Sequence, residues 1–206
     1  MTGANGTDGV SGASTAPIDD DQPSGGDLPS GDDLRAVMAD FATGVVVATT
    51  WAPGASDGSA DGGVGGGEGV DHATTLNSLT SVSLDPPLVL ISLGIDSRFA
   101  AQVRRTGVWG VSILPEDHVA TAMRFAARDR GVPLFGDLGF HRGVTGVALL
   151  DDALGRLECR TEAIHRAGDH DIVVGRVAAT EPHHREARPG AGPLVSFRRA
   201  FGGFHR

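Results

Sequence analysis

The chain contains no lysine and no tyrosine, and all 17 of its basic residues are arginines. The absence of lysine excludes chemistry that needs its amine, such as a Schiff base or the phosphate-binding lysine of a P-loop. The single cysteine, Cys159, excludes an internal disulfide framework and a metal site built from several cysteines. Because Cys159 alternates with Leu157 and Thr161 in a strand-like pattern, we predict a buried, unreactive thiol.

Long apolar runs are also missing. No stretch approaches the roughly 20 apolar residues that a helix needs to cross a bilayer, and the first residues lack the basic and apolar regions of a signal peptide. We therefore expect a soluble cytoplasmic protein that does not contact membranes. The sequence has no long basic stripe, so we do not expect nucleic-acid binding.

Two segments are rich in glycine and acidic residues. Residues 1–33 hold seven Asp and seven Gly with no Arg, which predicts a disordered acidic tail. Residues 52–71 hold eight Gly and four acidic residues, which predicts a flexible loop. These segments contain 11 of the 26 acidic residues, so the remainder has 15 acidic residues against 17 Arg. We predict one folded domain over 34–206, with 52–71 as a loop inside it.

The hydrophobic pattern predicts a mainly β domain. Strands outnumber helices, and the connections are too short for the crossovers that parallel strands require. This favours an antiparallel barrel or sandwich with a few peripheral α-helices, and it disfavours a Rossmann fold. We predict helices over 32–44, 97–107 and 115–128. We predict strands over 45–51, 72–83, 88–93, 108–114, 153–167, 170–180 and within 193–204, with 129–148 irregular.

Three polar patterns could form a site. The first is a group of small side chains that either lines a pocket or forms the polar face of a strand: Thr74, Thr75, Asn77, Ser78, Ser81 and Ser83. The second is Ser97-Arg98, which opens a helix and would favour a phosphate, although many ordinary helices begin this way. The third is His170 between two carboxylates, which suits proton handling or an anionic cofactor but also fits a solvated turn.

In this order, the motifs resemble the flavin reductase family. The resemblance covers residues 34–204. The matching pieces are Phe41-Ala-Thr-Gly44, Thr74-x-x-Asn77-Ser78-x-x-Ser81-Val-Ser83-x-Asp85-Pro-Pro87, Ser97-Arg98, Gly107-x-Trp109-x-Val111, Arg124-Phe125-Ala126, Leu157-Glu-Cys159, Gly168-Asp169-His170 and Pro193-Leu194. The resemblance implies an antiparallel split β-barrel of the FMN-binding type with a few peripheral helices. It also implies a homodimer with flavin sites near the subunit interface.

The resemblance further implies a set of site residues. The flavin ring and ribityl chain would lie against His72, Ala73, Thr74, Thr75, Asn77 and Ser78. The phosphate end would lie against Ser92, Leu93, Ser97 and Arg98, and Ala126 would border the flavin. Asp169 and His170 would lie on the nicotinamide side, with His170 as the catalytic residue.

The function implied is an NAD(P)H-dependent flavin reductase. Hydride would pass from NADH or NADPH to FMN or FAD, and reduced flavin would diffuse to a separate monooxygenase. One alternative is a non-catalytic flavin carrier or redox sensor on the same barrel, and another is a binder of a deazaflavin or haem. The loop over 52–71 directly precedes the flavin-binding stretch, so it either covers the site or extends into solvent.

Overall fold

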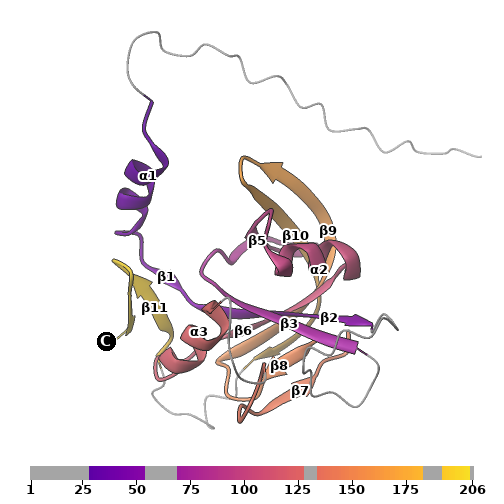
Figure 1. The fold of residues 1–206 in the computed structure, drawn as a ribbon. Coiled ribbons are helices and arrows are strands. Elements are labelled where there is room, and N and C mark those ends of the chain that lie inside the picture. Colours follow the sequence, from indigo (N-terminus) through magenta and orange to yellow (C-terminus); the bar gives the residue numbers. More distant parts are fainter. Residues whose placement is uncertain (1–27, 54–68, 128–133, 183–191, 205–206) are drawn as a thin grey trace, which may run out of the picture.

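A computed structural model describes residues 28–53, 69–127, 134–182 and 192–204. Most of the predicted tail and loop (1–27 and 54–68) lies outside these residues. The mainly β class is confirmed, with strands outnumbering helices in the described chain (Figure 1). In chain order the elements are α1 (Gly31–Met38), β1 (Thr43–Gly44), β2 (Val46–Pro53), β3 (Gly69–Leu76), β4 (Thr80–Leu84), β5 (Pro87–Gly94), α2 (Arg98–Thr106), β6 (Val108–Ile113), α3 (Val119–Ala126), β7 (Phe140–Arg142), β8 (Ala148–Leu150), β9 (Gly155–Ala167), β10 (His170–Pro182), β11 (Leu194–Phe197) and β12 (Ala200–Gly203).

The main sheet has seven antiparallel strands in the order β3-β2-β6-β9-β10-β5-β4. Its two edge strands, β3 and β4, are nevertheless consecutive in the chain and are joined only by residues 77–79. A flat sheet of this size would be roughly 29 Å across, whereas this connection spans at most about 14 Å. The sheet must therefore curl until its edges approach each other. Within the described residues no ladder pairs β3 with β4, so the predicted barrel is not closed by hydrogen bonds.

The curled sheet encloses one apolar core. Trp109, Val111 and Ile91 are fully buried in it, and α2 contributes Val103. Cys159 is also buried in this core, and burial raises the pKa of its thiol to about 12. The predicted burial of this thiol is therefore confirmed. A second core cluster lies between the sheet, α3 and the β7–β8 hairpin, where Phe125 packs against Phe135.

Helix α2 begins and ends where the sequence predicts. The Ser97 hydroxyl accepts a hydrogen bond from the Ala100 N–H at 3.1 Å, which caps the first turn. Gly107 adopts φ 67° and ends the helix in the left-handed conformation that glycine tolerates best. With nine residues, α2 is the longest helix of the described chain, and none of its helices is long and apolar enough to cross a membrane.

Helix α3 begins at Val119, four residues after the predicted start at Pro115. The intervening residues form a turn instead, and the start of this turn contacts the C-terminal segment. Pro115 forms a β-bridge with Pro193, and the Glu116 N–H donates to the Gly192 carbonyl at 2.9 Å. This long-range pairing overrides the local preference of proline for the first turn of a helix. The predicted last residue, Arg128, lies outside the described residues.

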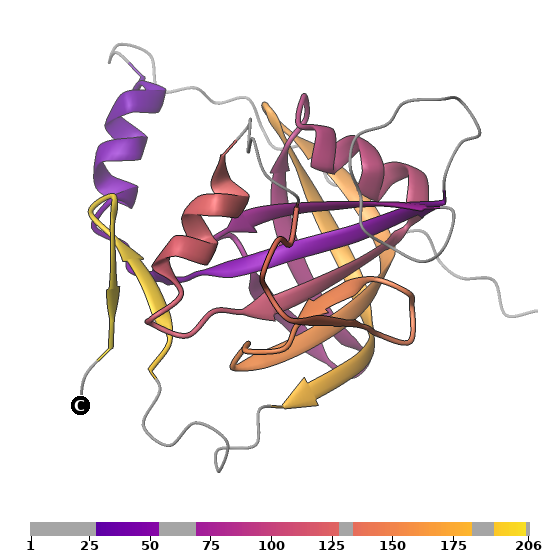
Figure 2. The ribbon, with the colours of Figure 1, turned by 60° about the horizontal axis from the view of Figure 1, so that its bottom comes forward.

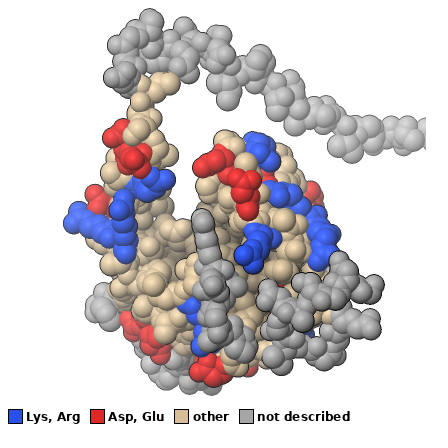
Figure 3. Space-filling model, in the orientation of Figure 1, with Lys and Arg blue, Asp and Glu red and all other residues tan. Residues whose placement is uncertain are grey.

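Helix α1 is shorter than predicted and stands apart from the sheet. It is capped by Ser30, two residues before the predicted start, and Asp33 completes a capping box by bonding back to Ser30. The predicted tail boundary at residue 33 thus falls inside the helix. Gly44, the last residue of the predicted helix, lies in β1 instead. Figure 2 shows α1 beside the β11–β12 hairpin, and the flank of the body next to it is largely uncharged (Figure 3).

Two short hairpins were not predicted. In the segment expected to be irregular, β7 and β8 pair, and the buried Glu158 carboxylate binds the turn through the Val144 and Thr145 N–H groups at 2.8 and 2.6 Å. In the segment expected to hold one strand, β11 and β12 form a hairpin. Its turn residues, Arg198 and Arg199, adopt positive φ angles of 49° and 62°, which Asn and Gly usually supply.

Gly175 of β10 allows Trp109 to pack across the sheet. A Cβ at position 175 would lie 2.3 Å from the Trp109 ring and 2.9 Å from the Cys159 Cβ. We expect Gly175→Ala to lower the free energy of unfolding by about 1–3 kcal/mol, as overpacking does, measured by urea denaturation. Gly155→Ala is the control, since its Cβ would meet Ile113 at an ordinary 3.6 Å. Equal stability of the two variants would contradict the packing argument.

Candidate cofactor site

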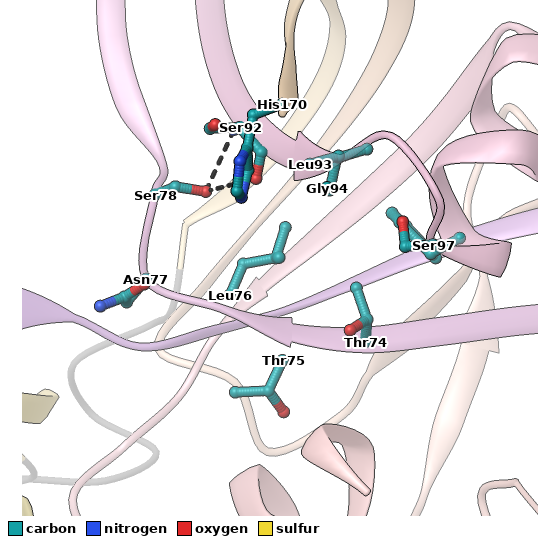
Figure 4. A pocket seen from close by; sticks show the side chains of 11 residues that line it. Thr74, Thr75, Leu76, Asn77, Ser78, Ser92, Leu93, Gly94, Ser97 and His170 are labelled. Carbon is teal, nitrogen blue, oxygen red and sulfur yellow. Dashed lines mark hydrogen bonds between the residues drawn. The ribbon is translucent and has the colours of Figure 1, made fainter. Parts of the chain in front are cut away.

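A cavity of about 320 Å³ opens where the two edges of the curled sheet approach each other. The end of β3, the connection to β4, the end of β5, the start of α2 and the start of β10 all contribute to it (Figure 4). Eight of the predicted site residues line this cavity: Thr74, Thr75, Asn77, Ser78, Ser92, Leu93, Ser97 and His170. Residues from both halves of the sequence thus converge at one place.

Thr74 and Thr75 have different roles because neighbouring side chains of a strand point to opposite faces. Figure 4 shows Thr75 directed away from Thr74. The Thr75 hydroxyl donates to the Ala122 carbonyl at 2.7 Å, so it fastens α3 to β3. Thr74 points to the same side as Leu76, and its hydroxyl makes no hydrogen bond to another described residue. Thr74 can therefore offer a hydrogen bond to a ligand, whereas Thr75 is already committed.

Ser78 ties the connection between the edge strands to β5. Its hydroxyl donates to the Ser92 carbonyl and accepts from the Ser92 N–H, both at 3.1 Å. A single side chain thus satisfies both backbone groups of one residue across the seam. Ser78 shapes the wall of the cavity, while its neighbour Asn77 is exposed at the rim with its amide accessible.

One end of the cavity is suited to an anion. The N–H groups of Arg98 and Phe99 open α2 and have no carbonyl acceptor within the helix. Ser97 lines the cavity at this end, and its hydroxyl proton is available while its oxygen caps the helix. The positive end of the helix dipole adds to these donors. Arg98 itself is exposed and does not line the cavity.

His170 forms another part of the wall, opposite Gly94 in the β10–β5 ladder. Its side chain is 48% exposed, and its Nδ1 lies 2.7 Å from Asp169 Oδ1. This hydrogen bond holds the pKa of Asp169 below its usual value, so the carboxylate is ionised at neutral pH. An ionised Asp169 places the proton on Nδ1 and directs Nε2 away from itself. A Cβ on Gly94 would lie 4.0 Å from that Nε2, which places it at the cavity wall.

Five predicted residues do not line the cavity: His72, Ala73, Arg98, Ala126 and Asp169. Ala73 is 5% exposed and packs in the second core cluster, and Ala126 is exposed as the last residue of α3. Asp169 acts through His170. Ser81 and Ser83 lie on β4 and also do not line the cavity.

Three lining residues were missed by the sequence reasoning: Leu76, Gly94 and Phe99. Strand alternation could have identified Leu76, because it shares a face with Thr74 and Ser78. Phe99 follows Ser97 and Arg98 in the first turn of α2. Nothing local marks Gly94, since it belongs to the site through its pairing with His170.

These features fit a flat, partly apolar ligand with an anionic tail. Leu76, Leu93 and Phe99 supply apolar walls, and small polar groups surround them. The N-terminus of α2 supplies the anion-binding part of the cavity. Within the described residues no cluster of three or more His, Cys, Asp or Glu side chains could hold a metal ion. The site therefore matches a flavin nucleotide through its donors and shape.

Comparison with known proteins identifies the family. Residues 38–205 match the family model of the flavin reductase like domain, and the chain belongs to that family. The NADH-dependent FMN reductase AsuE2 of Streptomyces nodosus subsp. asukaensis is 37% identical over 178 residues, covering 85% of this chain and 86% of that protein. The monooxygenase reductase subunit HsaB of Rhodococcus jostii (strain RHA1) is 32% identical over 156 residues, covering 76% and 71%.

A solved structure shares the fold. BorF is the flavin reductase component of a bacterial two-component tryptophan halogenase. It superimposes with a TM-score of 0.69 at 35% identity, covering 86% of this chain and 99% of that chain.

The two threonines provide a test of the site. We expect Thr74→Val to weaken flavin binding by roughly fivefold, the value of one lost hydrogen bond, with little change in stability. We expect Thr75→Val to lower the free energy of unfolding by about 1 kcal/mol, because α3 loses its bond to β3. Fluorescence titration with FMN and thermal unfolding measure the two effects. The assignment fails if Thr75→Val weakens binding as much as Thr74→Val without loss of stability.

Proposed function

We propose that this protein is an NADH-dependent flavin reductase that uses FMN or FAD. The observation that carries the proposal is a cavity lined both by the N-terminus of α2 and by His170, whose Nδ1 bonds Asp169. The preference for NADH over NADPH is supported by the name of AsuE2, an NADH-dependent FMN reductase. Use of NADH, an intracellular metabolite, implies a cytoplasmic location.

When bound next to each other, the nicotinamide and the flavin supply the hydride-transfer chemistry themselves. The protein binds and orients them. The Ser97 hydroxyl and the free N–H groups of Arg98 and Phe99 at the start of α2 would hold the flavin phosphate, and Thr74 and Asn77 would contact the polar edge of the ring system. Nε2 of His170 contacts the nicotinamide side and can hold a proton there. Correct placement of two reactants lowers the activation free energy by several kcal/mol. The walls of the cavity therefore need to be rigid.

We further infer that the curled sheet is the split barrel of this family and that reduced flavin leaves the site for a partner. HsaB is named as a subunit of a flavin-dependent monooxygenase, and BorF belongs to a two-component halogenase. Both names support a separate flavin-consuming enzyme. The rim position of Asn77 and the half-exposed His170 give the cavity an opening through which flavin can exchange.

The reductase activity predicts a specific role for His170. The wild-type protein should oxidise NADH and bleach FMN or FAD under anaerobic conditions. His170→Ala should raise the KM for NADH roughly tenfold, equivalent to one hydrogen bond to a charged group, and leave the flavin Kd nearly unchanged. His165→Ala is the control, because this exposed histidine on β9 does not line the cavity. Flavin binding without NADH oxidation by the wild type would indicate a carrier and overturn the proposal.

We also propose a homodimer in which α1 is part of the interface. None of the residues of α1 is buried within the chain. Leu34, Val37 and Met38 lie on one apolar face of the helix and are 61%, 70% and 50% exposed, and Phe41, three residues after the helix, is 63% exposed. An eight-residue helix is not stable in water on its own, and a contiguous apolar face of this kind usually marks an interface. A second copy of the chain would cover it.

A charge on this face should separate the subunits. We expect Val37→Asp to convert the dimer to a monomer, because burying an unpaired carboxylate in an interface costs several kcal/mol. Size-exclusion chromatography with light scattering measures the mass directly. Asp32→Asn lies on the opposite face of α1 and should remain dimeric. A monomeric wild-type protein would contradict the proposed assembly without affecting the reductase assignment.

A further inference from the structure

Asp171 lies next to His170 but faces away from the cavity, beneath α2. It is 3% exposed, and its carboxylate is ionised between two arginines. Its two oxygens are both occupied. Oδ2 accepts hydrogen bonds from Nε and Nη2 of Arg104 at 2.9 and 2.6 Å, and Oδ1 accepts from Nε of Arg166 at 3.0 Å.

Arg104 connects this carboxylate to the loop that begins α2. Besides Asp171, its Nη2 donates to the Ile95 carbonyl at 3.0 Å. The Ile95 N–H in turn donates to the Asp169 carbonyl at 3.1 Å. Residue 95 is therefore held on one side by Arg104 and on the other by the turn that carries His170. Two residues later, Ser97 caps α2 and begins the anion-binding end of the cavity.

The Asp171–Arg104 ion pair contributes little to the free energy of folding. An ion pair that takes a carboxylate out of water loses most of its Coulombic gain to desolvation, and apolar side chains of similar volume often stabilise as well. What the pair does provide is fixed geometry, because the fork of an arginine bonds two acceptors in defined directions. Here one acceptor is the Ile95 carbonyl, in the loop before α2, and the other is the Asp171 carboxylate, next to His170 in β10. Arg104 holds the pKa of Asp171 below its usual value, with Arg166 adding to the effect, so the tie persists at neutral pH.

We propose that Asp171 and Arg104 are positioning residues that fix the anion-binding loop and the His170 turn relative to each other. This inference rests on the proposed reductase function. Neither side chain lines the cavity, so both act through other residues: Arg104 through the Ile95 carbonyl, and Asp171 through Arg104 and its own place beside His170 in β10. Loss of the Asp171–Arg104 ion pair loosens both the loop before α2 and the turn that carries His170.

The proposal predicts a pattern of binding that a purely structural role would not give. We expect Asp171→Asn to raise the Kd for FMN and the KM for NADH about tenfold each, while the Kd for riboflavin rises less than about twofold, since riboflavin has no phosphate to place. Arg104→Lys should show the same split, because an ammonium keeps the charge but cannot span both acceptors. Arg166→Gln should have little effect, because Arg166 bonds Asp171 but not the loop.

The control is a second arginine–carboxylate pair, which joins β10 to β9 away from the cavity. Arg176 bonds Glu162 through two contacts of 2.9 Å each, and neither residue lines the cavity. Glu162→Gln should leave the FMN and NADH constants at wild-type values. Because a variant at 171 could be too unstable to assay, Arg104→Lys provides an independent route to the same measurement.

Hydrogen exchange supplies a readout without any cofactor. In Asp171→Asn the Ile95 amide should exchange at least about tenfold faster than in the wild type, since its carbonyl has lost Arg104 as an ordered partner. Unchanged exchange at Ile95, or an equal loss of FMN and riboflavin affinity, would overturn the proposal. So would an effect of Arg166→Gln as large as that of Asp171→Asn. Failure of the wild type to bind flavin or oxidise NADH would instead refute the reductase function, so the two failures are distinguishable.

Discussion

The short connection over 77–79 constrains the whole domain. It joins the two edge strands of a seven-stranded sheet, so the sheet cannot lie flat. Curling brings the end of β3 next to the end of β5, encloses Trp109 and Val111 as a core, and leaves a gap at the seam where no ladder forms in the described chain. The cavity lies in that gap. The candidate site is thus a consequence of how the sheet curls, and Ser78 stabilises its wall by bonding both backbone groups of Ser92.

No ladder of hydrogen bonds joins β3 to β4 within the described residues. The side chains at this seam therefore have two roles: some stabilise the fold, and others are available to a ligand. The hydroxyl groups of Thr75 and Ser78 bond the protein backbone, whereas the Thr74 hydroxyl and the Asn77 amide face the cavity without such a bond in the described chain. Composition alone cannot separate these two roles. Residues available to a ligand and residues that stabilise the fold both occur in this polar stretch. Assigning the whole stretch to a flavin site therefore does not separate the two. The division becomes visible only when the direction of each side chain is known.

Local signals predicted the elements whose ends are fixed by neighbouring residues. Ser97 and Gly107 mark α2 correctly, and Gly168-Asp169 marks the turn between β9 and β10. The predictions were wrong where residues distant in the sequence determine the local structure. The β7–β8 hairpin depends on the buried Glu158, the start of α3 depends on pairing with residues 192–193, and the β11–β12 turn uses two arginines where Asn or Gly is usual. The site residues themselves were predicted by family resemblance, because no local rule brings residue 170 to residue 94.

The lack of lysine has a structural counterpart in how this chain uses its arginines. Arg104 bonds both Asp171 and the Ile95 carbonyl, and Arg142 bonds both Asp71 and the Gly146 carbonyl. In each case one guanidinium joins a buried carboxylate to a backbone oxygen in a different segment. An ammonium presents a single compact charge and could not hold both acceptors in fixed directions. Arginine therefore supplies rigid links between segments that a small curled sheet cannot connect by strand pairing, and one of these links lies directly behind the candidate site.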